Sequence, residues 1–341
     1  MTTSRHDPPH PAVSLRDVLL AAKRIGPHVR RTALERSAAL SAEAGAEIWL
    51  KLECQQRTGS FKLRGALNRL LTLPPEARAS GVLTCSAGNH GLGVAEAARL
   101  TGIAATIVVP ENASPAKVAG LRRAGVELLL VGRDYDEAEE RAPAIARERG
   151  LAFVSPYDDP AVIAGAGTVA LETLLDLPEA GTLVVPVGGG GLASGIGIVA
   201  RALNPALRVV GVQSEASAAM AASLAAGRLV PVESAPTLAD GLAGNIAPGS
   251  STFPLVRDHL DSVITVPEAA IAAAMLAFLD RHHLIVEGSG AVGLAALRAG
   301  QLGDTPAPIV LIVSGSNVAT TVLADLLRGE GGPPRPPKPG G

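Results

Sequence analysis

Lys62 lies in a segment whose residue types favour a reactive amine. It follows Ser60 and Phe61 in a turn-like stretch between a run predicted as a strand (48–52) and a run predicted as a helix (66–73). A lysine on such a turn can project from a buried strand edge into a cleft, where the loss of water lowers its pKa and makes it a Schiff-base nucleophile. Most lysines are solvated surface charges, so this segment alone does not assign the role.

Four consecutive glycines, Gly188 to Gly191, form a candidate anion site. They lie between a predicted strand (182–187) and a helical pattern that opens with Leu192. Backbone N–H groups without neighbouring side chains can approach an anion closely, and the dipole of the following helix adds to the attraction. A flexible turn between strand and helix would have the same composition and would need no ligand.

The same glycine run nearly fits a dinucleotide-binding pattern. The spacing Gly188-x-Gly190-x-x-Ala193 is close to the dinucleotide fingerprint. That fingerprint requires an acid at the end of the next strand. The next predicted strand (208–213) ends in Gln213, and the run falls in the middle of the chain. A single phosphate therefore suits the run better than a dinucleotide.

The segment 86–90 follows another predicted strand (81–85) and opens a helix. Its backbone amides, together with the side chains of Ser86 and Asn89, suit a carboxylate ligand. The same residue types are favoured in an ordinary helix-capping turn, and the sequence leaves both interpretations open. His90 could act as a ligand or a base, although a lone histidine is more often simply hydrogen-bonded.

These candidates follow strands of one predicted sheet system. Short β-branched runs alternate with alanine-rich helical patterns, which predicts an α/β fold with mostly parallel sheets covered by helices on both faces. Ligands bind such folds at the carboxyl ends of the strands. Ser314, which ends the last strand, could offer a neutral hydroxyl to a ring nitrogen there, or could belong to a polar turn. Further strands are predicted at 105–109, 127–131, 262–266 and 308–314, and helices at 93–100, 115–124, 135–149, 162–175 and 268–282.

The order of these elements predicts two units. Residues 81–155 form a compact unit of three or four strands with their helices, and the rest forms a larger unit that this one interrupts. The tails at 1–13 and 329–341 are expected to be disordered, because the first is polar and the second is rich in glycine and proline.

Composition excludes several functional classes. The 341 residues carry a formal net charge of −2 and only 2% aromatic residues, so neither a basic surface nor aromatic platforms favour nucleic acid. The uncharged stretch 182–200 contains Pro186 and the glycine run, which fit a buried strand, loop and helix better than a membrane span. The N-terminus lacks the apolar segment of a signal peptide, and Cys54 and Cys85 have no metal-binding spacing. We therefore expect a cytoplasmic protein.

A lysine, a phosphate cradle, a carboxylate loop and a hydroxyl at one sheet edge fit pyridoxal 5′-phosphate and an amino acid. The chain resembles the fold-type II pyridoxal-phosphate family, in the threonine/serine dehydratase and serine racemase branch, over about residues 14 to 328. The motifs Thr-Gly-Ser-Phe-Lys-x-Arg-Gly-Ala, Ser-Ala-Gly-Asn-His-Gly and Gly-Gly-Gly-Gly-Leu carry this resemblance, in the order of the family.

The resemblance implies an architecture and an assembly. The fold would be that of tryptophan synthase β, with two open, mostly parallel sheets covered by helices. A small mobile domain (81–155) would be inserted in a large cofactor-binding domain (14–80 and 156–328). The family also implies a homodimer or homotetramer that acts on a small amino acid.

The resemblance also implies a role for each candidate residue. Lys62 would be the catalytic residue and would form the Schiff base with the cofactor, whose ring Phe61 would flank. Asn89 would donate a hydrogen bond to the phenolic oxygen, and Ser314 would contact the ring nitrogen. The cofactor phosphate would be held by Gly188, Gly189, Gly190, Gly191 and Leu192. The substrate carboxylate would be held by Ser86, Ala87, Gly88, Asn89 and His90.

Two departures from the racemase pattern are visible. Ala87 stands where serine racemases carry the serine that serves as the base on the opposite face, so racemisation should be poor. Gln213 and Ala219 stand where those racemases place the acids that hold a divalent cation, and Glu215 is near but off register. We therefore expect no metal at this place.

The expected reaction is a β-elimination that converts L-threonine or L-serine to a 2-oxo acid and ammonia. A hydroxyectoine-utilisation, 3-hydroxyaspartate or phenylserine dehydratase would carry the same motifs. Within this fold, the alternative is an isomerase, a serine racemase. Outside this fold family, the alternative is a nucleotide-binding or sensor module without catalysis. The segment 240–245 is a candidate for part of the substrate pocket, and its small uncharged residues after Asp240 disfavour an acidic substrate side chain.

Overall fold

The computed structural model describes residues 13–113 and 115–329. The tails predicted at 1–13 and 329–341 fall, apart from their innermost residues, outside these ranges. Among the helices in the described ranges, none is long and apolar enough to cross a membrane.

Two separate sheets organise the described residues, as predicted. The larger has six strands in the order β1-β2-β10-β7-β8-β9 and the smaller has four in the order β5-β4-β3-β6. All neighbours are parallel except β1 and β2. The larger sheet contains β1 (Leu34–Arg36), β2 (Ile48–Lys51), β7 (Thr182–Pro186), β8 (Arg208–Ser214), β9 (Ser262–Val266) and β10 (Ile309–Ile312). The smaller contains β3 (Val82–Cys85), β4 (Ala105–Val109), β5 (Glu127–Leu130) and β6 (Ala152–Phe153).

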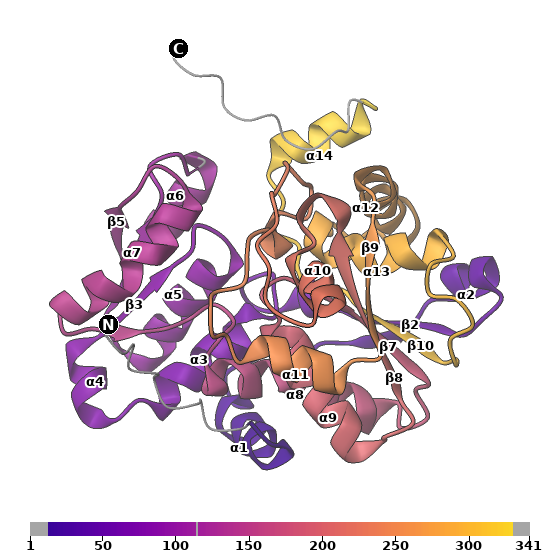
Figure 1. The fold of residues 1–341 in the computed structure, drawn as a ribbon, viewed down its shortest axis with the longest axis horizontal. Helices are drawn as coiled ribbons and strands as arrows, with labels where there is room; N and C mark the ends of the chain where they lie inside the picture. The colour runs from indigo at the N-terminus through magenta and orange to yellow at the C-terminus, as the bar shows by residue number, and fades with distance from the viewer. Residues whose placement is uncertain (1–12, 114, 330–341) are drawn as a thin grey trace.

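The predicted fold class is therefore confirmed. All strands of the smaller sheet lie, in sequence, between β2 and β7 of the larger one. Figure 1 shows the smaller sheet and its helices on the left of the molecule and the larger sheet on the right. The central strands of the larger sheet are buried on both faces, which is why their sequences are continuous apolar runs with no alternation. The sequence missed the short strands β1 and β6.

Helices cover both sheets. They are α1 (Leu15–Ile25), α2 (Ala38–Ala44), α3 (Lys62–Thr72), α4 (Pro75–Ser80), α5 (Asn89–Thr101), α6 (Pro115–Arg123), α7 (Tyr135–Glu148), α8 (Pro160–Asp176), α9 (Gly191–Leu203), α10 (Ala219–Ala226), α11 (Thr252–His259), α12 (Glu268–His282), α13 (Gly288–Arg298) and α14 (Thr320–Leu327). Short 3₁₀ turns lie at Glu53–Gln55, Glu215–Ser217 and Asp240–Leu242.

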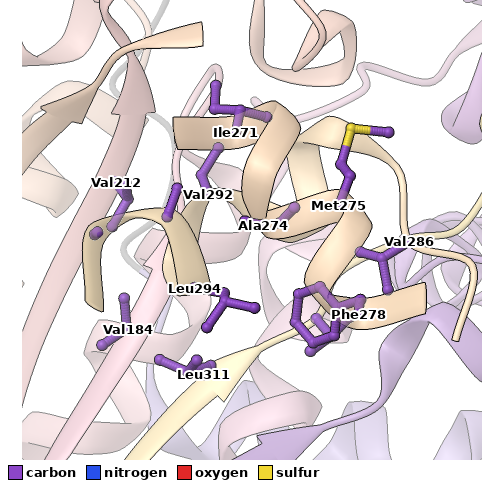
Figure 2. Close-up of a cluster of buried hydrophobic side chains, with 14 of the residues drawn as sticks. Val184, Val212, Ile271, Ala274, Met275, Phe278, Val286, Val292, Leu294 and Leu311 are labelled. Carbon is purple, nitrogen blue, oxygen red and sulfur yellow. The ribbon is translucent and has the colours of Figure 1, made fainter. Parts of the chain in front are cut away.

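One face of the larger sheet packs against α12 and α13. Figure 2 shows Phe278 of α12 and Leu294 of α13 directed towards Val184 and Leu311 of the sheet. Val286, in the connection between the two helices, is 2% exposed and belongs to the same cluster. This core fixes the start of α13, which lies beside the candidate site.

Helix α3 joins the two sheets. It packs against α5 of the smaller unit and α8 of the larger one. The approach to α8 is close: a Cβ on Gly165 would lie 2.5 Å from the carbonyl oxygen of Arg64. Because the N-terminus of α3 carries Lys62, both helices determine where its side chain lies.

Candidate active site

Lys62 is the first residue of α3, so the helix begins four residues earlier than the sequence predicted. Phe61 already has helical dihedral angles, with φ −59° and ψ −19°. Before it, Gly59 has φ +73°, and a Cβ there would lie 2.8 Å from a side-chain oxygen of Asn317. This position therefore requires glycine. The sharp turn ends the connection from β2, and α3 begins directly after it.

The Lys62 amine is partly enclosed and weakly basic for a lysine. Its Nζ donates a hydrogen bond to the carbonyl oxygen of Pro156 at 2.8 Å. Burial lowers the pKa of Lys62 to about 8, and the carboxyls of Glu287 and Glu139 oppose that shift. Desolvation of an ammonium group has this effect because it penalises the charged form. A neutral amine, the form that acts as a nucleophile, is thus accessible near neutral pH.

The glycine run leads from β7 into α9, and side chains could not be accommodated there. A Cβ on Gly189 would lie 2.5 Å from the ring of Tyr157, and one on Gly191 would lie 2.7 Å from the Tyr157 carbonyl oxygen. Gly190 has φ +94°. Ser194 N–H donates to the Gly190 carbonyl at 2.8 Å. The N–H groups before it belong to the first turn of α9, which a helix leaves without internal partners.

The segment 86–90 runs from the end of β3 into the first turn of α5, which begins at Asn89. The Gly88 N–H donates to the Ser86 hydroxyl at 3.2 Å. His90 is buried, with Nε2 3.3 Å from the carbonyl oxygen of Val154. Burial lowers the pKa of His90 to about 3, and the nearby Lys62 adds to the shift. His90 is therefore neutral, and a carboxylate here would be held by amides and hydroxyls.

Ser314 lies just past the end of β10, next to the Lys62 segment. The Phe61 N–H donates to the Ser314 carbonyl at 3.1 Å, and Ser60 and Gly315 form an isolated antiparallel bridge. The buried Ser314 hydroxyl is 3.5 Å from the carbonyl oxygen of Ser289. Since that distance is long for a hydrogen bond between oxygens, the hydroxyl can turn towards another partner.

Glu287 contacts the candidate site, although the sequence analysis did not identify it. The Asn89 Nδ2 donates to its Oε1 at 2.6 Å, and the residue is 5% exposed. Burial raises the pKa of Glu287 to about 7, with a contribution from Asp240, while the bond from Asn89 opposes the rise. A Cβ on Gly315 would lie 2.2 Å from a carboxyl oxygen of Glu287. An acid directly before a glycine-rich helix start was the available sequence signal.

Charged side chains form ion pairs with Arg64, which lies in the first turn of α3 two residues after Lys62. Two carboxylates bracket the Arg64 guanidinium: Glu53 accepts at 2.8 Å from both Nε and Nη2, and Glu172 accepts at 2.7 Å from Nη1. Lys51 Nζ donates to Glu172 at 2.7 Å. We call Lys51, Glu53, Arg64 and Glu172 the buried ion cluster. Two cations and two anions balance its charge, and it joins β2, α3 and α8.

The segment 240–245 borders the glycine run. A Cβ on Gly188 would lie 3.1 Å from Cα of Leu242, and the Gly241 N–H donates to the Ser289 hydroxyl at 3.0 Å. Asp240 pairs with Lys117 of α6 at 2.6 Å. This ion pair connects a segment of the larger unit to a helix of the smaller one.

The positions considered for a metal have other partners. Gln213 Oε1 accepts from the Ala221 N–H at 2.8 Å, Ala219 is buried in the core, and Glu215 is exposed. Within residues 13–113 and 115–329, no group of three or more His, Cys, Asp or Glu side chains is arranged to hold a metal ion.

We predict that a chelator leaves both catalytic activity and melting temperature unchanged within error. The Gln213 amide holds the start of α10 by a hydrogen bond, so this place needs no cation to order it. Activity assays and thermal melts of the purified protein with and without EDTA check this. A loss restored specifically by magnesium or calcium would show that a cation binds elsewhere.

The site defines a class of protein. A partly enclosed lysine amine and a helix N-terminus suited to a phosphate lie at the carboxyl ends of the strands of an α/β fold. Such an arrangement serves a phosphate-bearing cofactor that a lysine holds covalently. The chain belongs to the pyridoxal-phosphate dependent enzymes: the family model described as "Pyridoxal-phosphate dependent enzyme" matches residues 25–315. The relatives and solved structures described next confirm the resemblance to the fold-type II dehydratase and racemase branch.

Relatives and solved structures agree with this assignment. The chain is 44% identical over 311 residues to an L-threonine ammonia-lyase of Thermotoga maritima. The aligned region covers 91% of this chain and 77% of the relative. Its fold matches maize serine racemase with a TM-score of 0.87 at 35% identity, covering 94% of this chain and 98% of the other. It matches the processed form of threonine deaminase isoform 2 from Solanum lycopersicum with a TM-score of 0.84 at 31% identity, covering 95% and 98%.

Pyridoxal phosphate fits the residues present. The glycine run offers backbone N–H groups of a helix N-terminus and tolerates no side chain, and Lys62 supplies a weakly basic amine. The individual roles of Phe61, Lys62, Asn89, the glycine run, Leu192 and Ser314 stay predictions, as do those of residues 86–90.

Proposed function

We propose that this chain catalyses the β-elimination of a β-hydroxy amino acid, with L-threonine and L-serine as substrates, to give a 2-oxo acid and ammonia. The observation that carries the proposal is the Lys62 amine, with its pKa lowered to about 8, in a chain 44% identical to an L-threonine ammonia-lyase. Burial prepares this amine for proton transfer, and the relative supplies the substrate class.

Each residue of the candidate site has its own role in the proposed reaction. Pyridoxal phosphate, when bound, draws electrons from the substrate's α-carbon and makes its hydrogen acidic. Lys62 Nζ removes that proton, because its lowered pKa leaves a neutral fraction near neutral pH. The Ser86 hydroxyl and the backbone N–H groups of the first turn of α5, which begins at Asn89, hold the substrate carboxylate. Ser314 offers a neutral hydroxyl, which does not force a ring nitrogen to stay protonated.

A substrate screen tests this proposal. The purified protein, loaded with pyridoxal phosphate, is incubated with L-threonine, L-serine, 3-hydroxyaspartate and phenylserine, and the 2-oxo acid formed is measured. We expect the highest kcat/KM with threonine or serine, because the segment 240–245 is small and uncharged after Asp240. Higher activity on another β-hydroxy amino acid would keep the reaction and correct the substrate. The absence of 2-oxo acid from all of them would overturn the reaction.

Elimination should exceed racemisation. Reprotonation from the face opposite Lys62 needs an acid there, and the methyl group of Ala87 cannot supply a proton. With L-serine, chiral chromatography should show much less D-serine than pyruvate. The Ala87→Ser variant should raise the ratio of D-serine to pyruvate by on the order of tenfold, since a hydroxyl without supporting contacts falls short of a well-placed acid. An unchanged ratio would show that residue 87 does not separate the two activities.

Three further expectations accompany the reaction. The chain forms a homodimer or homotetramer, it lies in the cytoplasm, and residues 81–155 move as a small domain relative to 14–80 and 156–328. The assembly and the domain motion rest on the family resemblance. Light scattering of the purified protein tests the first, and a monomer at micromolar concentration would contradict it.

A further inference from the structure

The side-chain amide of Asn317 has a fixed orientation. Its Nδ2 donates to the carbonyl oxygen of Thr58 at 2.8 Å and to Oδ1 of Asn89 at 2.6 Å. A backbone carbonyl can only accept, so the nitrogen of Asn317, and not its oxygen, must face Thr58. Both N–H groups of Asn317 are then used, and the atom of Asn89 that receives one of them is its oxygen.

Glu287 fixes the other side of the Asn89 amide. Because its oxygen faces Asn317, Asn89 turns its Nδ2 to Glu287 and donates to Oε1 at 2.6 Å. A carboxyl group keeps an oxygen that can accept this bond whether or not it is protonated. The two neighbours therefore agree: the oxygen of Asn89 faces Asn317, and its nitrogen faces Glu287. One N–H of Asn89 is bound by Glu287, and the second is left to donate to another group.

The main chain around Glu287 is itself anchored. Its N–H donates to the Gly315 carbonyl at 3.1 Å, and the preceding Val286 packs beside Phe278 in the core that Figure 2 shows. A hydrogen bond from the backbone N–H of Asn317 reaches the Glu287 carboxyl as well. The acceptor for Asn89 is thus fixed in place by elements far from Asn89 in the sequence.

We propose that Glu287 and Asn317 are positioning residues that orient the Asn89 amide, so that it offers its remaining N–H, and not its oxygen, to the phenolic oxygen of pyridoxal phosphate. The inference rests on the proposed function and on the contact with the phenolic oxygen that the family resemblance implies for Asn89. The orientation matters because a donor stabilises a phenolate, whereas the lone pairs of an inverted amide would repel it. The sequence does not reveal this, because the three side chains come from α5, the start of α13 and the segment after β10.

The Asn317→Asp variant tests the orientation. A carboxylate at position 317 accepts only, so Asn89 would turn both N–H groups to the carboxylates at 287 and 317 and leave its oxygen to the cofactor. We expect the dissociation constant of pyridoxal phosphate to rise about 10- to 100-fold, since a hydrogen bond to a charged group is lost. The absorbance of bound cofactor should shift towards the shorter-wavelength form with a protonated phenolic oxygen. Asn317 is exposed, so the melting temperature of the apoprotein should change little.

Two comparisons separate orientation from other effects. Asn317→Ala removes the hydrogen bonds to Thr58 and Asn89 but leaves Glu287 to orient Asn89, so it should weaken cofactor binding much less than Asn317→Asp. Ala319→Asp places the same charge two residues away, at the exposed N-cap of α14, and should bind pyridoxal phosphate like the wild type. In an Asn89→Ala background, adding Asn317→Asp should have no further effect, because the amide it inverts is absent.

Each outcome decides between the proposals. Equal dissociation constants for Asn317→Asp and Asn317→Ala, with normal wild-type binding, would overturn this inference and leave the proposed function intact. A charge effect that persists without Asn89, or that Ala319→Asp reproduces, would also overturn it. Failure of the wild type to bind pyridoxal phosphate would overturn both the proposed function and the inference built on it.

Discussion

Replacing Lys62 with alanine should abolish both the covalent attachment of pyridoxal phosphate and turnover. Lys62 Nζ is the partly enclosed amine with a pKa of about 8 at the start of α3, and alanine supplies neither the nucleophile nor the base. Removing a residue that acts both as nucleophile and as base lowers the rate of turnover by on the order of 10³-fold or more. The alanine side chain should be tolerated, because the Lys62 amine donates its hydrogen bond to a backbone carbonyl, that of Pro156, and not to a carboxylate.

Borohydride reduction followed by peptide mapping measures the attachment directly. In the wild type the adduct should fall on Lys62, and in the variant no peptide should carry it. Lys23→Ala, which changes an exposed lysine of α1, serves as the matched control and should keep both adduct and activity. An adduct on any other lysine in the wild type would show that the wrong residue has been assigned.

Arg64→Leu should destabilise the apoprotein by about 3–5 kcal/mol, because it leaves two carboxylates of the buried ion cluster without their shared partner. The Arg64 and Glu53 side chains are fully buried, and Glu172 is nearly so. Glu53 keeps its pKa below the ordinary value although burial opposes this, because Arg64 stabilises its charge. Without the guanidinium, burial would raise the pKa of Glu53 and destabilise its charged form. A fall in melting temperature of roughly 10 °C is expected for a chain of this size.

Thermal and denaturant unfolding of the apoprotein measure this effect without a contribution from the cofactor. Arg31→Ala is the matched control, since Arg31 and Asp176 form an exposed pair at 2.5 Å, and it should cost less than about 1 kcal/mol. Arg64→Lys should fall between the two, because an ammonium group cannot bridge both carboxylates as a planar guanidinium does. A cost for Arg64→Leu as small as that of the control would show that the cluster contributes little to stability.

Local patterns predicted most of the fold. The strands at 105–109 and 262–266 have the predicted bounds, because buried β-branched runs flanked by turn residues are a local signal. Helix α3 begins earlier than its apolar pattern indicates. Its first turn contains Lys62 and Arg64, whose burial depends on partners that a pattern of apolar residues does not reveal.

The parts of the site that belong to one short motif could be predicted from the sequence. The contacts between residues far apart in the sequence could not. The glycine run and the segment 86–90 are each contiguous, so their chemistry is visible in the sequence. Asn89 and Glu287 are 198 positions apart, and Arg64 and Glu172 are 108 apart. No periodicity connects such pairs, and only the folded chain brings them together. Tyr157, which packs on Gly189, was missed for the same reason.

The pairing of β2 with β10 sets the order in which the protein can mature during its synthesis. Ile48 pairs with Ile309, so the middle of the larger sheet cannot close until the residues of β10 have left the ribosome. The smaller sheet uses only residues 82 to 153 and can fold much earlier. The bridge between Ser60 and Gly315, which places Lys62 beside Ser314, depends on the same late event. A nascent chain therefore acquires its chemistry only after β10 has emerged, and truncated chains that lack β10 should remain inert.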